Sequence, residues 1–204
     1  MPRRPYTQQV RAETAAQTRQ RVLDAVYDRL RQAPAERVTV DGVAKNAGVS
    51  RATIYLVFGD RSGLFDAIGA DLLERSGFVE VMRAVDDPDT RAAIDRFLHA
   101  TTQMYARNQD VLRSLFAMAQ IDPTALGGSI ARMEEGRHHG MQLLARRLAD
   151  EELLREGADA TQAADLLWLM SSFAGFDLLA AGHGRSPEKI ADTFLATLKL
   201  SVLR

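Results

Sequence analysis

Residues 39–59 read TVDGVAKNAGVSRATIYLVFG, and this stretch constrains the fold more than any other part of the chain. Thr39 and Ser50 are residue types that cap the N-termini of helices, and each precedes a short run of helical character. Gly48 stands between the two runs, where a glycine adopts positive φ and closes a turn without a Cβ clash. Gly59 ends the second run. The pattern predicts two short helices joined by a glycine turn, which is the arrangement of a helix-turn-helix.

The apolar residues of this stretch are spaced to form one small core between the two helices. Its expected members are Val40, Val43, Ala44, Ala47, Val49, Ile54 and Phe58. With that core inward, polar residues lie at the start and on the outer side of the second helix, which is where a recognition helix meets the major groove. Arginine binds guanine through two hydrogen bonds, and threonine and tyrosine reach bases or phosphates. The predicted DNA-contact residues are Thr39, Ser50, Arg51, Thr53, Tyr55 and Arg61; Thr39 and Arg61 are included because helix N-termini bind phosphate.

The rest of the chain also has helical character. A first helix is expected from about Ala15 to Gln32, ending before Pro34, and a fourth from about Asp60 to Ser76. The later segments are rich in Ala, Leu, Arg, Glu and Gln, which favour helix, and none shows the alternation of a β-strand. The sequence therefore predicts an all-α chain with about nine helices.

Charge divides the chain unevenly. Residues 1–61 contain eleven Lys and Arg against six Asp and Glu, a net charge of +5, whereas the whole chain has a net charge of −1. A basic N-terminal segment (residues 1–61) followed by an acidic remainder indicates that the N-terminal segment binds a polyanion. Five arginines form a basic arm around the first helix, which tracks phosphates or enters a minor groove unless it is a solvated tail: Arg3, Arg4, Arg11, Arg19 and Arg21.

The stretch TVDGVAKNAGVSRATIYLVFGDRSGLFDAI resembles the N-terminal DNA-binding domain of the TetR family of transcriptional regulators. The matching positions run in the correct order over about thirty residues: Thr39, Val40, Val43, Ala44, Ala47, Gly48, Val49, Ser50, Tyr55, Phe58, Arg61, Leu64 and Phe65. Val57 departs from the family pattern, in which histidine is common at this position. Because Leu56 and Val57 lie where polar contacts to DNA are expected, this helix is expected to form fewer hydrogen bonds than most relatives do.

The resemblance implies a domain organisation and a mechanism. Residues 1–61 form the basic arm and the helix-turn-helix domain, and residues 62–204 form a ligand-binding and dimerisation domain that begins with a connecting helix at 62–76. The expected function is that of a cytoplasmic homodimeric repressor, which a small molecule releases from a pseudo-palindromic operator. No cofactor, metal ion or membrane is expected to take part. In the family the last two helices form the dimer interface, so the expected interface residues are Phe176, Leu179, Phe194 and Leu198. Packing inside a single chain is the competing explanation for these residues.

A pocket for the effector is expected in the body. Methionine fills space flexibly, and methionine together with aromatic residues suits an apolar or aromatic ligand. The expected lining residues are Met104, Tyr105, Phe116, Met141, Trp168 and Phe173. Packing in the core explains each of these residues as well.

Two other functions remain open from the sequence. A helical adaptor that binds only protein would explain the apolar last helices but not the residues from Thr39 to Phe65. A metal-dependent enzyme would use Glu134 and His138, whose i, i+4 spacing on a helix suits a divalent ion. The chain has four histidines and no cysteine, so further metal ligands are few.

Overall fold

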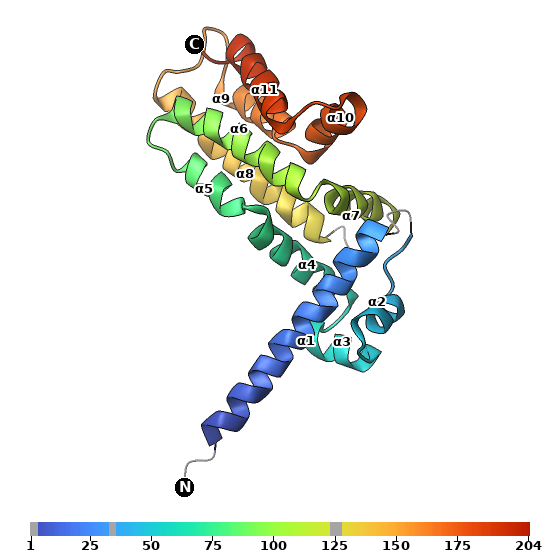
Figure 1. The fold of residues 1–204 in the computed structure, drawn as a ribbon. Helices are drawn as coiled ribbons and strands as arrows, with labels where there is room; N and C mark the ends of the chain where they lie inside the picture. The colour runs from blue at the N-terminus through green and yellow to red at the C-terminus, as the bar shows by residue number, and fades with distance from the viewer. Residues whose placement is uncertain (1–3, 33–35, 123–127) are drawn as a thin grey trace. The chain divides into compact units, whose positions relative to one another are not determined.

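The computed structural model describes residues 4–32, 36–122 and 128–204, and this part of the chain consists of helices joined by turns and loops (Figure 1). It contains no strand, only an isolated bridge between Leu154 and Leu203. The helices are α1 (Arg4–Gln32), α2 (Val40–Ala47), α3 (Arg51–Phe58), α4 (Arg61–Ser76), α5 (Phe78–Val85), α6 (Thr90–Arg107), α7 (Gln109–Ile121), α8 (Gly128–Asp150), α9 (Ala160–Met170), α10 (Phe173–His183) and α11 (Pro187–Ser201). The all-α prediction is confirmed.

The chain packs as two units, and neither is a single continuous segment. One unit comprises Met1–Leu72 and Arg113–Ser129, and the other comprises Leu73–Leu112 and Ile130–Arg204. Helices α4 and α7 each contribute residues to both units. The domain boundary expected between residues 61 and 62 remains a prediction.

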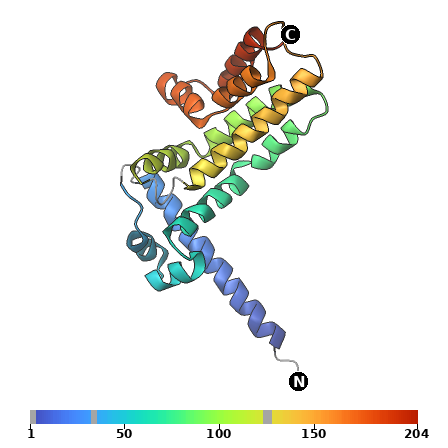
Figure 2. The ribbon, with the colours of Figure 1, turned by 180° about the vertical axis from the view of Figure 1, so that it is seen from behind.

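The first unit is built around the buried face of α1. Val22, Val26 and Leu30 repeat every four residues along this helix and are at most 1% exposed, as expected for one apolar stripe. Helix α2 packs against α1 and α3, and α2 and α3 lie beside α1 in both views (Figures 1 and 2). The C-terminal half of α7 belongs to this unit, and the Ser114 hydroxyl donates a hydrogen bond to the carbonyl oxygen of Leu30 at 3.1 Å.

The helix-turn-helix forms through the caps that the sequence predicts. Thr39 Oγ1 accepts a hydrogen bond from the Gly42 amide at 3.1 Å, and Ser50 Oγ accepts one from the Thr53 amide at 3.1 Å. Gly48 has φ of +64°, and its amide bonds the carbonyl oxygen of Lys45 at the end of α2. Thus α3 follows α2 after a three-residue turn.

The second unit contains α5, α6, α9, α10 and α11, with α6 packed against both α5 and α11. Arg147 on α8 stabilises the turn between α5 and α6. Its guanidinium donates hydrogen bonds to the carbonyl oxygens of Val85 and Asp87 and to the Thr90 hydroxyl. These bonds satisfy carbonyl groups that the end of α5 leaves unpaired.

Two expectations about helix boundaries need correction. The described part of the chain has eleven helices instead of about nine, and residues 161–181 form two of them, α9 and α10, which meet at a bend of 45°. The Ser172 hydroxyl starts α10 by accepting a hydrogen bond from the Gly175 amide, and this local bond competes with a continuous helix. Helix α1 begins at Arg4 and not near Ala15, so its basic N-terminal residues are helical. Arg3 lies outside the described residues.

Candidate functional site

Helix α3 presents one buried side and one exposed side. Ile54 is fully buried, whereas Arg51, Tyr55 and Leu56 are exposed, with Leu56 at 86%. Phe58 is half-buried beneath the guanidinium of Arg19, which lies 5.6 Å from the ring centre. Ile54 therefore anchors the helix, and the exposed side is available to a partner.

Arg51 takes part in a small polar cluster on this exposed side. Its Nε lies 3.1 Å from Asp41 Oδ1, and its Nη2 lies 3.5 Å from the Tyr55 hydroxyl. The hydrogen bond to Tyr55 and the charge of Asp41 both raise the pKa of Arg51. The Asp41 side chain is 68% exposed, so water screens this ion pair and Arg51 can exchange Asp41 for another anion at low cost.

The three predicted serine and threonine contacts have structural roles. Thr39 and Ser50 are N-caps, and the Ser50 and Thr53 hydroxyl oxygens lie 2.9 Å apart. A capping oxygen accepts a bond from the backbone, but its own hydrogen can still be donated to a phosphate oxygen. The structure thus brings Ser50, Arg51, Thr53 and Tyr55 together at the exposed start of α3.

Arg61 differs from the other predicted contacts because its guanidinium is already engaged. Nη1 donates a hydrogen bond of 2.5 Å to Asp122 Oδ2, and Nη2 donates one of 3.0 Å to the carbonyl oxygen of Val38. The guanidinium carbon also lies 5.5 Å from the centre of the Phe65 ring. Asp122 follows α7 and is 13% exposed, so this ion pair is half-buried.

The predicted effector residues lie in the second unit, except Phe116, which belongs to the first. Tyr105, Met141 and Phe173 are buried, Met104 is half-buried and Trp168 is 37% exposed. Tyr105 packs edge-on against Phe173, with ring centroids 5.4 Å apart, and its hydroxyl donates a hydrogen bond of 2.9 Å to the carbonyl oxygen of Ser171. Burial raises the pKa of Tyr105.

Arg137 on α8 lies at the edge of this aromatic cluster. Its guanidinium is 5.5 Å from the centre of the Trp168 ring and donates a hydrogen bond of 2.9 Å to the Ser171 hydroxyl. It also forms an ion pair with Glu134 and bonds the carbonyl oxygen of Trp168. The bend between α9 and α10 is therefore tied to α6 through Tyr105 and to α8 through Arg137.

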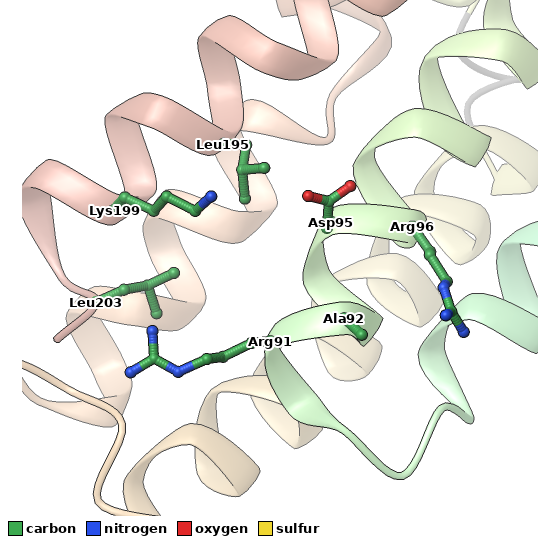
Figure 3. A pocket seen from close by; sticks show the side chains of 7 residues that line it. All are labelled: Arg91, Ala92, Asp95, Arg96, Leu195, Lys199 and Leu203. Atoms are coloured by element: carbon green, nitrogen blue, oxygen red, sulfur yellow. The ribbon is translucent and has the colours of Figure 1, made fainter.

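Shallow grooves lie on the surface of each unit in the described part of the chain. One, of about 370 Å³, lies between α6 and α11, with exposed charged side chains around a small apolar floor (Figure 3). Its lining residues are Arg91, Ala92, Asp95, Arg96, Leu195, Lys199 and Leu203. Another, of about 380 Å³, lies between α1 and α2. Neither groove is lined by a predicted effector residue.

The predicted dimer residues are mostly core residues of the single chain. Phe176, Phe194 and Leu198 are at most 8% exposed, and Leu179 is half-buried. The large apolar side chains that α10 and α11 leave exposed are Leu178, at 69%, and Leu200, at 75%. These two leucines offer apolar area to a second copy.

The described residues include no group of three or more side chains suited to a metal ion. Glu134 is paired with Arg137, and His138 packs against Trp168 with ring centroids 4.8 Å apart. Among the described helices, none is long and apolar enough by itself to cross a membrane. The bent pair of α9 and α10 meets that criterion only when taken together, by length and composition.

Comparison with known proteins identifies the family of the helix-turn-helix. Residues 22–68, which include the buried face of α1, the turn and the start of α4, match the family model described as bacterial regulatory proteins of the tetR family. The helix-turn-helix domain of this chain thus matches that of the TetR family. The matched family and the sequence relatives are transcriptional regulators and not enzymes, which favours a regulator over the metal-dependent enzyme.

Two TetR-like relatives support this assignment by sequence. The HTH-type transcriptional regulator AlkX of Mycobacterium tuberculosis is 34% identical over 122 residues, which are 60% of this chain and 50% of AlkX. The chain thus spans half the length of that relative. YdeS, an HTH-type transcriptional regulator of Bacillus subtilis, is 27% identical over 153 residues, 74% of each protein.

Solved structures of TetR-like regulators share the fold. NalD of Pseudomonas aeruginosa, the secondary repressor of the MexAB-OprM multidrug efflux pump, superposes with a TM-score of 0.71 at 20% identity, over 94% of this chain and 98% of NalD. SmeT in complex with triclosan has a TM-score of 0.68 at 18% identity, over 92% of each chain. At these identities the likeness concerns the fold.

Sequence reasoning missed the acidic partners of the site. Asp41 and Asp122 hold the two arginines predicted to bind DNA, and Arg137 supports the predicted effector region. The separation of ten residues between Asp41 and Arg51 follows from the helix-turn-helix and was open to prediction. Asp122 lies 61 residues after Arg61, and no local sequence pattern indicates that pairing.

Proposed function

We propose that this protein is a cytoplasmic, homodimeric transcriptional repressor that binds a specific operator and releases it when a small molecule binds. The observation that carries the proposal is the exposed side of α3, where Arg51 and Tyr55 lie beyond a capped helix start and opposite fully buried Ile54. A rigid helix with polar side chains at its N-terminal end suits the major groove.

The DNA-binding residues have distinct proposed roles. Arg51 exchanges Asp41 for a guanine edge or a phosphate, and Tyr55 and Thr53 bind phosphate or a base edge. Thr39 and Ser50 donate their hydroxyl hydrogens to phosphates while they continue to cap their helices. Arg61 binds a phosphate only after it leaves Asp122. We include the arginines at the start of α1 as a source of non-specific, salt-dependent affinity.

Dimerisation gives this arrangement its specificity. Two copies of α3 related by a two-fold axis would meet successive major grooves of a pseudo-palindromic operator. The proposed interface is formed by α10 and α11, with Leu178 and Leu200 as its exposed apolar side chains and Phe176, Leu179, Phe194 and Leu198 as the layer beneath them.

The proposed effector is small and either apolar or aromatic. The aromatic cluster of Tyr105, Phe173 and Trp168 supports this choice, together with Met104 and Met141; Phe116 is a further candidate. The complex of SmeT with triclosan shows that a protein of this fold takes up a small molecule. An effector lowers operator affinity only if it binds the DNA-free arrangement more tightly than the DNA-bound one.

Selection of genomic fragments followed by transcription in vitro tests the repressor function. The purified protein should enrich fragments that share a two-fold symmetric sequence overlapping a promoter, and it should reduce transcription from them. Transcription that rises on addition of protein would identify an activator instead. Absence of any enriched fragment would favour the alternative function, a helical adaptor that binds only protein.

A further inference from the structure

The exposed side of α3 has an apolar stripe at its centre. Leu56 is 86% exposed, more than any other large apolar side chain in the described part of the chain, and Ala52, one turn earlier, is also exposed. Two residues correspond to about 200° of rotation on a helix, so both side chains lie nearly opposite Ile54. Because Ile54 is the buried anchor of α3, the stripe marks the direction in which the helix points outward.

The polar residues lie on the flanks of this stripe. Arg51 and Tyr55 are on one side, bonded to each other, and Thr53 is on the other, where its hydroxyl contacts Ser50. Exposed leucines that occur singly are common on protein surfaces and need no explanation. Leu56 differs because it occupies the centre of a surface whose other exposed groups are suited to DNA.

Charge indicates that the occupant of this surface is DNA. Residues 1–61 have a net charge of +5, and the polyanion that such a surface attracts most strongly is a nucleic acid, whose charges are densely spaced. A helix that enters the major groove meets base edges along its most protruding line, and on α3 that line consists of Ala52 and Leu56.

The major groove offers few features that a leucine can recognise. Base edges there present hydrogen-bond donors and acceptors, and the C5-methyl group of thymine is the apolar exception. A leucine placed over the donor or acceptor of a G·C pair would remove water without replacing its hydrogen bonds, which costs free energy. The same leucine over a thymine methyl group buries apolar surface on both partners.

We propose that Leu56, supported by Ala52, recognises a thymine methyl group in each half of the operator and is a specificity-determining residue. This inference rests on the proposed function, because it assigns a base to the helix that is proposed to read DNA. Burial of one methyl group corresponds to about a fourfold change in affinity, and two symmetric half-sites give about fifteenfold.

Deoxyuridine substitution tests the proposal, because deoxyuridine lacks only the C5-methyl group. A duplex is first selected from a random library by the wild-type protein. Each thymine is then replaced by deoxyuridine, symmetrically in both halves, and dissociation constants are measured at one salt concentration. At one position the replacement should weaken wild-type binding by about fifteenfold. The Leu56→Ala variant should bind the unmodified duplex about as weakly as the wild type binds the substituted one. Deoxyuridine at that position should not lower the affinity of the variant any further.

Leu169→Ala is the matched control, because Leu169 is another exposed leucine, at 62%, in the other unit of the chain and outside the proposed dimer interface. This variant should keep the full sensitivity to deoxyuridine. Equal wild-type affinity for all substituted duplexes would overturn the inference and leave the proposed function standing. If deoxyuridine weakened binding by the Leu56→Ala variant as much as binding by the wild type, the inference would also be overturned and the proposed function would stand. If no duplex is enriched, both the proposed function and the inference fail.

Discussion

The guanidinium of Arg61, at the first residue of α4, donates a 2.5 Å hydrogen bond to the carboxylate of Asp122, directly after α7. The same guanidinium bonds the carbonyl oxygen of Val38, which immediately precedes the N-cap of α2. One side chain thus links the end of α7 to the entrance of the helix-turn-helix. A carboxylate and a phosphate compete for one guanidinium, so Asp122 opposes the phosphate contact proposed for Arg61.

Replacing Asp122 should therefore strengthen DNA binding. In Asp122→Asn the amide holds Arg61 less tightly, and Arg61 is released to a phosphate in each half-site. We expect tighter binding to the selected duplex by several-fold and a salt dependence that is steeper by about 0.9 per added phosphate contact. Fluorescence anisotropy over a series of salt concentrations measures both quantities.

Glu36→Gln controls for the change in net charge. Glu36 is exposed and forms an ion pair with Arg29 in the same unit, so this variant also removes one negative charge beside an arginine. It should leave the salt dependence close to that of the wild type. Identical behaviour of the two variants would attribute the effect to charge alone and not to release of Arg61.

The turn of the helix-turn-helix should tolerate a side chain at Gly48 poorly. A Cβ atom there has open space, but φ of +64° disfavours any residue other than glycine, and Gly48→Ala should cost about 1–2 kcal/mol of stability. Gly69→Ala is the comparison, because Gly69 lies inside α4 with ordinary φ and nothing within 4 Å of a Cβ. That change should stabilise the protein by about 0.5–1 kcal/mol. Urea titration measures the free energy of unfolding of both variants. Equal values for the two would contradict the different roles assigned to the two glycines.

Tyr105→Phe should destabilise the second unit by about 1–2 kcal/mol, because the carbonyl oxygen of Ser171 loses its 2.9 Å hydrogen bond. Burial raises the pKa of Tyr105, so above pH 10 the phenol ionises in the unfolded chain before it ionises in the folded one. Ionisation then favours unfolding, and the stability advantage of the wild type over Tyr105→Phe should shrink as pH rises above 10. A constant difference between pH 8 and pH 11 would contradict this reasoning.

Self-association should depend on the exposed leucine of α10. Leu178→Asp places a charge at a site that is 69% exposed in the single chain, so the fold should persist while the dimer dissociation constant rises at least tenfold, since symmetry uses the site twice. Leu143→Asp, on α8 at 47% exposure, is the control. Sedimentation equilibrium distinguishes them, and equal dissociation constants for the two variants would place the interface elsewhere.

Local patterns predicted the helix-turn-helix well because its determinants are close together in sequence. Thr39, Ser50 and Gly48 act through bonds to backbone groups a few residues away, so their roles follow from residue type and spacing. The buried positions of α2 and Ile54 follow from helical periodicity in the same way. Val49 and Phe58 are less buried than expected, because each remains partly exposed at the surface of this small unit.

Local sequence patterns could not predict contacts between residues that are distant in sequence. The bend between α9 and α10 depends on Ser172, but residues 161–181 are apolar enough to read as one helix. Whether a phenylalanine such as Phe176 faces its own core or a second copy depends on helices distant in sequence. The same holds for Asp122, whose partner is identified only once α4 and α7 are in place.

Binding of the selected duplex by a variant with Arg51→Ala and Tyr55→Ala tests the central claim, that the exposed side of α3 reads DNA. The wild type should prefer the selected duplex over a scrambled one by about a thousandfold or more. The double variant should lose most of this preference and keep the wild-type melting temperature, because both side chains are exposed. Arg146→Ala, an exposed arginine on α8, should behave as the wild type. Unchanged affinity of the double variant for the selected duplex would contradict the account.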